Sequence, residues 1–239
     1  MKRIAFASFK GGAGKTTAVM AVTSSLIAKG KCVALIDADE NTPLIDWREA
    51  AQAAATWSNH CTVYEADDLR GFETAFEEAE NAGVDFAIID TRGGGSELNN
   101  ACLINTDLVV IPSALTSLDM TQALLTFEHT VEIHQSMDME IPVALLIQRV
   151  PVGKLTVSQR QSLEALSELP RCETILHARD AYAAMARQGL LHLTYNALSA
   201  DLMKRFNANH VALAMKEADN LTNDLLEALG DLPGGTNGD

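Results

Sequence analysis

A glycine-rich loop near the N-terminus most strongly limits how this chain can fold. It follows the apolar run 4–7 and reads Phe9-Lys10-Gly11-Gly12-Ala13-Gly14-Lys15-Thr16-Thr17. Glycines let the backbone come close to an anion, and a helix that begins at the loop directs its N–H groups and its positive dipole end to the same point. The pattern predicts a strand, a phosphate-binding loop and a helix, which together open an α/β fold.

Two lysines and a threonine give this loop side chains that bind phosphate and metal. Lys15 can place a full charge on the β- and γ-phosphates of a nucleotide, and the Thr16 hydroxyl can bind Mg²⁺. The standard pattern G-x-x-x-x-G-K-[ST] has glycine at the position of Phe9, and here a second lysine, Lys10, follows it. On the residues alone, Lys10 is either a further phosphate ligand or a solvated loop charge. The predicted nucleotide contacts in the loop are Lys10, Gly11, Gly12, Ala13, Gly14, Lys15, Thr16 and Thr17.

Short apolar runs alternate with helical patterns along the rest of the chain. The predicted strands after the loop are 32–36, 61–65, 86–89, 108–111, 143–147 and a short one at 174–176. The helices expected in the last third are 157–169, 181–187 and 200–229. Because alternating strands and helices build parallel sheets, we predict one doubly wound α/β domain, with a mostly parallel sheet flanked by helices. This domain is expected to span residues 1–231, followed by a disordered tail at 232–239.

The composition agrees with a single domain in a reducing compartment. A chain of 239 residues suits one α/β domain, and 47% hydrophobic with only 5% aromatic residues indicates an aliphatic core. The cysteines at 32, 61, 102 and 172 form no C-x-x-C pair, so we expect free thiols. The N-terminus lacks the order of a signal peptide and no apolar run could span a bilayer. We therefore expect a cytoplasmic protein.

Polar side chains follow several of the predicted strands. In a parallel sheet the carboxyl ends of the strands meet at one edge, where ligands bind. Asp90 is placed to support Mg²⁺ opposite Thr16, and Asp37 is expected to support the metal from another strand end. Asp39 lies two residues further on, where it could position the attacking water. Each of these carboxylates could instead be only a turn former or a helix cap.

Gln148 ends a later predicted strand and offers both a donor and an acceptor to adenine. A polar side chain that simply faces water at the strand end is an equal alternative.

The charge is unevenly distributed along the chain. The net charge is −14, yet residues 149–216 carry nine basic and five acidic side chains. Such a region is either an ordinary solvated face or a surface that binds DNA phosphates without sequence preference. The candidate DNA contacts are Lys154, Arg160, Arg171, Arg179, Arg187, Lys204 and Arg205.

The loop together with Asp37, Asp39 and Asp90 resembles the deviant Walker ATPases of the ParA and MinD group, and the resemblance covers nearly the whole chain. It implies a P-loop fold, ATP and Mg²⁺ as cofactors, and slow ATP hydrolysis that times the lifetime of a homodimer. It implies that Lys10 crosses the dimer interface to the partner's nucleotide. It also assigns charge stabilisation to Lys10 and Lys15, and activation of water to Asp39.

Further motifs resemble the VirC-type ATPases of T-DNA and conjugative transfer. They are Asp90-Thr91-Arg92-Gly93-Gly94, Ser96-Glu97-Leu98-Asn99-Asn100, Gln148-Arg149-Val150-Pro151-Val152-Gly153, Ser158-Gln159-Arg160, Arg179-Asp180-Ala181 and Leu191-His192-Leu193-Thr194. This resemblance implies an ATP-bound dimer that binds double-stranded DNA and recruits a relaxase or coupling protein, at the nucleoid or the cell pole. Two departures from the wider group, Glu40-Asn41 after Asp39 and Thr91-Arg92 after Asp90, concern partners and activators more than ATP binding.

Several alternative functions stay open at this stage. The first is a plasmid or cargo partition ATPase with a centromere-binding partner. A metabolic P-loop ligase or kinase, or a scaffold that binds nucleotide without turnover, would also carry the loop. The last predicted helix is acidic at 217–227 and would be repelled by anionic lipid, so we expect no membrane anchor.

Overall fold

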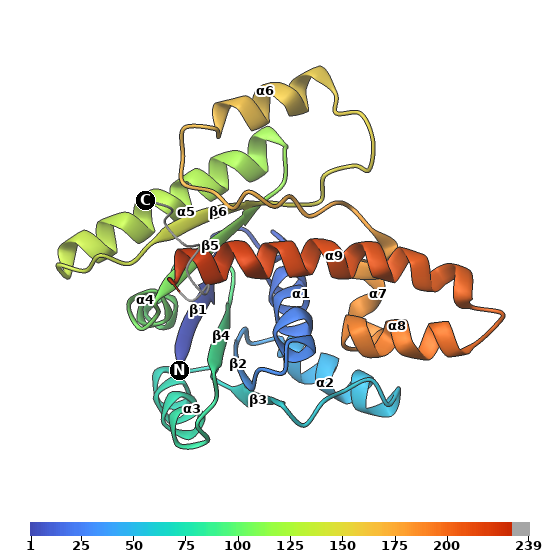
Figure 1. The fold of residues 1–239 in the computed structure, drawn as a ribbon. Coiled ribbons are helices and arrows are strands. Elements are labelled where there is room, and N and C mark those ends of the chain that lie inside the picture. Colours follow the sequence, from blue (N-terminus) through green and yellow to red (C-terminus); the bar gives the residue numbers. More distant parts are fainter. Residues whose placement is uncertain (231–239) are drawn as a thin grey trace, which may run out of the picture.

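Six parallel strands form the centre of the molecule in the computed structural model, which describes residues 1–230 (Figure 1). Their order across the sheet is β3-β2-β4-β1-β5-β6. The strands are β1 (Lys2–Phe6), β2 (Val33–Ala38), β3 (Cys61–Glu65), β4 (Phe86–Thr91), β5 (Leu108–Ser113) and β6 (Val143–Ile147). The single doubly wound sheet confirms the predicted fold class.

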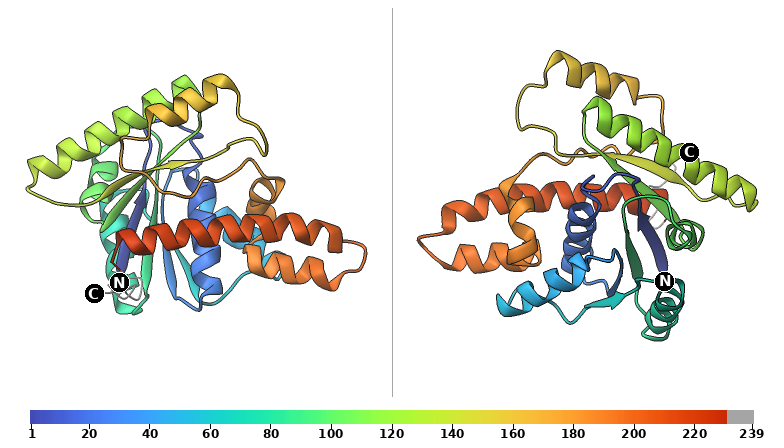
Figure 2. Two further views of the ribbon diagram at one scale, coloured as in Figure 1. Left: turned by 45° about the horizontal axis from the view of Figure 1, so that its top comes forward. Right: turned by 180° about the vertical axis from the view of Figure 1, so that it is seen from behind.

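Helices cover both faces of this sheet (Figures 1 and 2). The first face packs against α1 (Lys15–Ala28), α2 (Pro43–Ala53), α7 (Asp180–Gln188), α8 (Leu191–Ala200) and α9 (Arg205–Ala228). The second face packs against α3 (Leu69–Asn81), α4 (Glu97–Ile104), α5 (Ser117–Ser136) and α6 (Val157–Ala165). Every residue of β2, β4 and β5 is buried, which explains why these strands appear in the sequence as continuous apolar runs.

Side chains alternate between the two cores as a strand requires. In β1, Ile4 and Phe6 join the core under α1, whereas Ala5 joins the core under α3 and α4. The helices on the second face begin at side-chain caps. Ser96 accepts a hydrogen bond from the backbone of Asn99 at the start of α4, and Thr116 caps α5 in the same way.

The C-terminal third departs from the sequence prediction in three places. The helix predicted at 157–169 ends at Ala165, as α6. The strand predicted at 174–176 does not form as a regular strand. The segment 171–177 meets β6 and the residues after it through the isolated bridges Leu145–Arg171 and Val150–His177 and a hydrogen bond from the backbone of Leu176 to the carbonyl of Ile147, which do not make a continuous ladder. The helix predicted at 200–229 begins only at Arg205, and α8 precedes it as a separate helix that the sequence did not indicate. Thr, Tyr, Asn and Ser give α8 weak helix propensity, so its packing against α1 and α9 stabilises it.

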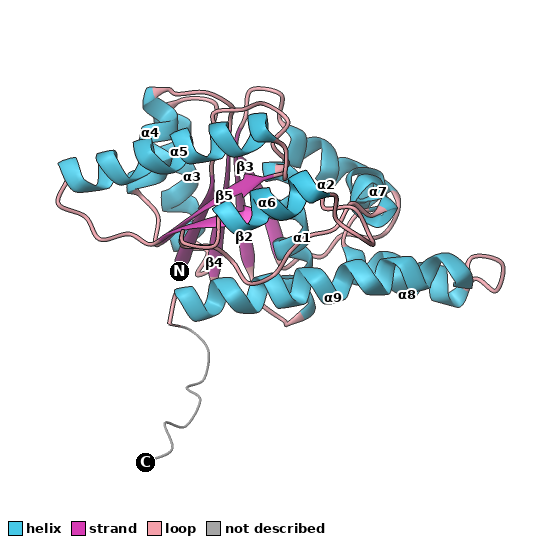
Figure 3. Cartoon of the chain, turned by 90° about the horizontal axis from the view of Figure 1, so that it is seen from above, coloured by secondary structure: helices cyan, strands magenta, loops and turns pink. Residues whose placement is uncertain are grey.

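Helices α8 and α9 run side by side as a hairpin whose closed end extends away from the sheet (Figures 1 and 3). The predicted tail at 232–239 and the domain boundary at 231 lie outside the described residues. Within the described part of the chain, no helix has the length and hydrophobicity required to cross a bilayer.

Candidate nucleotide site

The glycine-rich loop joins β1 to α1 in the predicted strand–loop–helix order. Gly12 and Gly14 adopt positive φ angles of 73° and 92°. A Cβ atom on Gly14 would lie 2.3 Å from Nε2 of Gln148, whose amide donates a hydrogen bond to the carbonyl of Ala13. Gly14 is therefore required both by its backbone conformation and by the close approach of Gln148. Lys15, the first residue of α1, is buried.

Two aspartates lie side by side at the carboxyl end of the sheet, where sequence reasoning placed a metal. Asp37 of β2 pairs in register with Asp90 of β4, and both are fully buried. The Thr16 hydroxyl donates to Oδ2 of Asp90 over 2.5 Å. The Oδ1 atoms of Asp37 and Asp90 have no hydrogen-bond partner among the described residues. Two unpartnered carboxylate oxygens beside a threonine hydroxyl fit the oxygen-donor preference of Mg²⁺.

Burial changes the protonation of the groups around this point. It raises the pKa of Asp90 to about 7 and that of Asp37 to about 6. Burial also lowers the pKa of Lys15, although the nearby charges of Asp90 and Asp39 oppose that change. A cation bound between the aspartates would favour their ionised forms, so these groups are arranged for a positively charged ligand.

Asp37 and Asp39 have different surroundings. Asp37 Oδ2 accepts hydrogen bonds from the backbones of Leu44 at 2.8 Å and Ile45 at 3.3 Å, and so also caps the start of α2. Asp39 is half-buried, and its Oδ1 accepts from the backbone and the side-chain amide of Asn41, at 3.0 and 2.8 Å. Asn41, noted in the sequence only as a departure from the ParA and MinD pattern, therefore orients Asp39.

Lys10 has a partner that the sequence did not reveal. Its Nζ lies 2.5 Å from Oδ1 of Asp119 in the first turn of α5. The hydroxyl of Thr116 donates to the other carboxylate oxygen over 2.6 Å. Burial would raise the pKa of Asp119, but the hydrogen bonds from Lys10 and Thr116 outweigh it and lower that pKa. Lys10 is thus held by an ion pair within its own chain, and the solvated-charge alternative does not describe it.

The glycine-rich segment after Asp90 packs directly on the phosphate-binding loop. A Cβ atom on Gly93 would lie 3.1 Å from the backbone nitrogen of Gly11. The amide of Asn99 donates to the carbonyl of Arg92 over 3.1 Å and also to that of Gly94. The motif quoted from the sequence therefore forms a second wall of the cradle, fixed by α4.

Gln148 is 2% exposed, so the alternative that it faces water is wrong. It lines a cavity of about 350 Å³ together with Thr17, next to the phosphate-binding loop. Tyr182 and Arg179 also line this cavity, and the Arg179 guanidinium donates to Oε1 of Glu217 at 2.6 and 3.0 Å. The assignment of Gln148 to adenine stays a prediction, since its amide nitrogen already donates to the carbonyl of Ala13. Glu217 lies 38 residues from Arg179 in sequence, so no local pattern could have indicated the pair.

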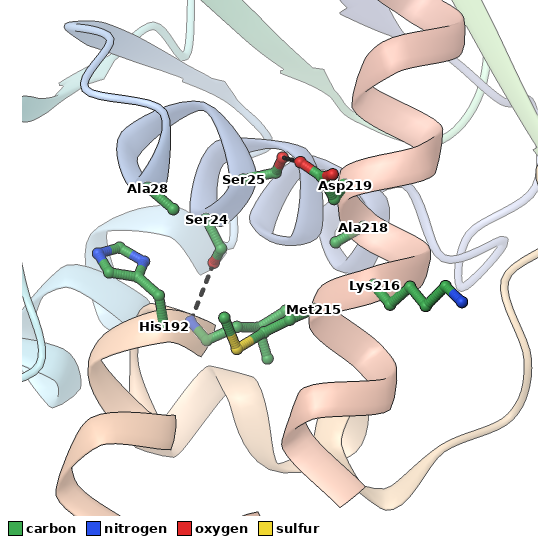
Figure 4. Close-up of a pocket in the computed structure, with 9 residues that line it drawn as sticks. Ser24, Ser25, Ala28, His192, Met215, Lys216, Ala218 and Asp219 are labelled. Atoms are coloured by element: carbon green, nitrogen blue, oxygen red, sulfur yellow. Dashed lines mark hydrogen bonds between the residues drawn. The ribbon is translucent and has the colours of Figure 1, made fainter. Parts of the chain in front are cut away.

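A second cavity, of about 240 Å³, lies between α1, α8 and α9 (Figure 4). It is lined by Ser24, Ser25 and Ala28 near the C-terminal end of α1, and Ser24 accepts a hydrogen bond from the backbone of Leu191. Ser24 is nine residues from Lys15, which corresponds to roughly 14 Å along a helix. This cavity is therefore separate from the phosphate-binding loop.

The seven candidate DNA contacts do not form one cluster. Lys154 and Arg160 are exposed around the start of α6, and Arg187 is exposed at the end of α7. Arg171 lines a depression with Asp224, and Arg179 is paired with Glu217 beside the cavity that Gln148 lines. The remaining two, Lys204 and Arg205, lie at the closed end of the α8–α9 hairpin.

The cysteines and histidines carry no metal site in the described residues. All four cysteines are free thiols, as expected. Among the histidines, His134 is buried and its Nε2 lies 3.0 Å from the carbonyl oxygen of Leu103.

Known proteins similar to this chain include members of one protein family and a ParA protein. The family model described as VirC1 protein matches residues 1–231. The virC1 protein of Rhizobium radiobacter is 46% identical over 231 residues, which covers 95% of this chain and 100% of that protein. A ParA protein of the same organism is 27% identical over 150 residues, covering 63% of this chain and 65% of the relative.

Solved structures support the fold. A plasmid partition protein from Borrelia burgdorferi B31 bound to AMPPNP superposes with a TM-score of 0.66 at 17% identity, covering 95% of this chain and 98% of that one. The sequence relatives and the family match together confirm the resemblance drawn from the motifs. The chain belongs to the VirC1 protein family, and its fold is that of the partition protein structure.

Proposed function

We propose that this protein is a Mg-ATPase whose ATP-bound homodimer binds DNA and positions DNA-transfer complexes. The observation that carries the proposal is the pair of unpartnered Oδ1 atoms on Asp37 and Asp90, beside the Thr16 hydroxyl and the phosphate-binding loop. Such an arrangement suits a nucleotide with its metal. A ParA protein is among the relatives, and the Borrelia plasmid partition protein, which has the same fold, was solved with the ATP analogue AMPPNP.

Each residue of the site has a role in this proposal. Lys15 and the backbone N–H groups of the loop bind the phosphates, and Mg²⁺ held by Thr16, Asp90 and Asp37 would neutralise their charge. Asp39, oriented by Asn41, positions the water that attacks the γ-phosphate. Lys15 from the same chain and Lys10 from the partner stabilise the charge that develops during transfer. The cavity beside Gln148 receives the base.

A second copy of the chain is proposed to close the site. Lys10 leaves Asp119 and reaches the partner's nucleotide. Two exposed apolar side chains lie close to these residues in the sequence: Leu118 is next to Asp119, and Val152 is four residues after Gln148. Exposed apolar side chains of this kind suit the core of a contact between two protomers.

DNA binding is proposed to use the exposed cations of the dimer. Lys154, Arg160 and Arg187 are the candidates with exposed side chains on the body of the protein. Charges on two protomers would act together, and binding through phosphates alone weakens steeply as salt concentration rises. Arg179 is a weaker candidate, because Glu217 occupies its guanidinium. The recruited complex is proposed to be a relaxase or coupling protein of a transfer system.

Hydrolysis and DNA retardation measured on the same preparations test the proposal. Asp39→Ala should bind ATP as tightly as the wild type while turnover stops. This variant, trapped with ATP, should retard unrelated DNA duplexes at low salt and lose them at high salt. Unchanged ATP turnover in Asp39→Ala would show that Asp39 does not position the attacking water. Absence of DNA retardation at low salt would contradict DNA binding.

The second candidate is a partition ATPase that moves a plasmid or protein cargo. The 27% identical ParA relative favours it. The transfer and partition functions would use the same ATP site but different partner proteins. Pull-down with a purified relaxase, compared with a centromere-binding protein, distinguishes them.

A further inference from the structure

The closed end of the α8–α9 hairpin exposes three large apolar side chains within five residues. Leu202 is 78% exposed, Met203 91% and Phe206 75%. Figures 1 and 3 show this turn at the far end of the hairpin, beyond the helices that cover the sheet. The Phe206 ring contacts His210, with 5.4 Å between the ring centroids, yet all three side chains stay largely exposed. Such exposure at a protruding turn indicates that they serve a contact with another surface.

Cations are interleaved with these apolar side chains. Lys204 and Arg205 stand between Met203 and Phe206, and both are exposed. Lys204 is paired with Asp201 at 3.3 Å, which leaves Arg205 to give the turn a net positive charge. The turn therefore offers apolar and basic groups together on a convex surface.

The acidic part of α9 is distant from this turn. Glu217 is the first of its acidic residues and stands twelve residues after Arg205, which corresponds to roughly 18 Å along a helix. Charges at this separation are largely screened at physiological salt, where the Debye length is about 8 Å. The acidic residues that argued against a membrane anchor therefore leave the tip unaffected.

We propose that the turn 202–206, the hairpin tip, docks on an anionic lipid surface and inserts Leu202, Met203 and Phe206 among the headgroups. A lipid surface accepts a convex apolar wedge without a matching groove, and basic side chains beside the wedge pair with anionic headgroups. A DNA duplex would satisfy the cations, but it offers the apolar side chains no partner unless its bases are unstacked. Charge and apolar exposure together therefore favour lipid.

Lipid docking by the tip does not depend on the ATP site. The dimer proposed to form with ATP would nevertheless make lipid attachment tighter. A single tip with three apolar side chains gives weak, reversible attachment. A dimer carries two tips, and if both face one surface their combined attachment is much tighter. The proposal departs from the sequence-based expectation of no membrane anchor, which considered only the acidic end of α9.

Co-sedimentation of the full chain with vesicles tests the proposal. We expect binding to vesicles of phosphatidylcholine and phosphatidylglycerol, and much weaker binding to phosphatidylcholine alone. Met203→Ser/Phe206→Ser should reduce binding at least about 10-fold, because two large apolar side chains no longer gain the free energy of burial among the headgroups. Met137→Ser is the matched control, since Met137 is also exposed but lies at the end of α5.

A second measurement follows the tip itself. Phe206→Trp should shift its fluorescence to shorter wavelength on anionic vesicles and be quenched by brominated lipid, against the constant background of Trp47 and Trp57. Failure of the wild type to bind anionic vesicles, or binding unchanged in Met203→Ser/Phe206→Ser, overturns the proposal. It is also overturned if the double variant loses DNA retardation or self-association while keeping vesicle binding, because the tip is then a DNA wedge or a protein contact.

Discussion

The carboxyl edge of the sheet, with Asp37, Asp90 and the phosphate-binding loop, and the hairpin tip are built in opposite ways. At the edge, charged groups are buried, and the unpartnered oxygens of Asp37 and Asp90 are held rigidly by paired strands. At the tip, apolar groups are exposed on a short turn. Buried charged groups and exposed apolar groups both reduce the unfolding free energy of the chain without a ligand. The comparison suggests that both arrangements are compensated by binding, of a charged ligand at the edge and of an apolar surface at the tip.

Removing the buried lysine should have the largest effect. Lys15→Ala is expected to weaken ATP binding about 100-fold or more, which corresponds to about 2.7 kcal/mol, because the phosphates lose a full charge in a site shielded from water. Isothermal titration with a non-hydrolysable ATP analogue measures this. Lys31→Ala, at an exposed position, should bind normally. Equal affinities for both variants would show that the buried lysine does not serve the nucleotide.

The raised pKa of Asp90 makes the stability of the ligand-free protein depend on pH. Burial raises this pKa from 3.8 to about 7, so the folded state binds the proton more tightly than the unfolded state. The carboxyl therefore stabilises the ligand-free protein fully below about pH 4, and this contribution is lost as pH rises through 7.

Asp90→Asn should accordingly raise the melting temperature of the ligand-free protein at pH 8 by several degrees, and by less at pH 5. The same variant should lose the Mg²⁺ dependence of ATP binding. In the wild type, the apparent Mg²⁺ affinity should fall as pH drops below 7, because protons compete for the carboxylate. A wild-type protein more stable than the variant at pH 8 would contradict the view that buried charge costs stability here.

Gly14→Ala tests how rigid the edge is. We expect a loss of about 1–3 kcal/mol in unfolding free energy, because the new methyl group meets the Gln148 amide at a residue with positive φ. Chemical denaturation measures it. Gly30→Ala is the matched control, since Gly30 has a positive φ but open space around it. Similar losses in both variants would show that Gln148 adapts and that the loop is less constrained than proposed.

Releasing Lys10 should have the smallest effect. Asp119→Asn removes the ion pair that holds Lys10 within its own chain and should strengthen ATP-dependent dimerisation several-fold, as expected for a partly exposed pair. Light scattering over a range of protein concentrations measures the dimer constant. Asp138→Asn, at an exposed position just after α5, is the control. Weaker dimerisation in Asp119→Asn would indicate that Asp119 supports the interface.

The sequence predicted the residues at the carboxyl edge of the sheet better than the structure of the hairpin tip. The loop from Lys10 to Thr17 and the aspartates at strand ends are local patterns, and parallel pairing brings strand ends together in any fold of this class. Contacts between distant segments were not predictable. The Lys10–Asp119 pair and the Gln148 contact to Ala13 each join residues more than 100 positions apart.

The α8–α9 hairpin was missed because its signals are weak. Leu191–Ala200 contains several poor helix formers and lacks a side-chain cap, so tertiary packing decides its structure. The exposed residues Leu202, Met203 and Phe206 appear in the sequence as part of an ordinary apolar pattern. Only the structure separates them from the core residues Val211 and Ala214 of the same helix region.

Sedimentation velocity of the wild type, Asp39→Ala and Lys10→Ala, with and without Mg-ATP, tests most directly whether a second copy completes the site. We predict that the wild type and Asp39→Ala are monomers without nucleotide and form dimers with Mg-ATP, most persistently in Asp39→Ala. Lys10→Ala should bind ATP yet remain mostly monomeric. A wild type that stays monomeric at saturating Mg-ATP, or a dimer that responds neither to ATP nor to the loss of Lys10, would contradict the account.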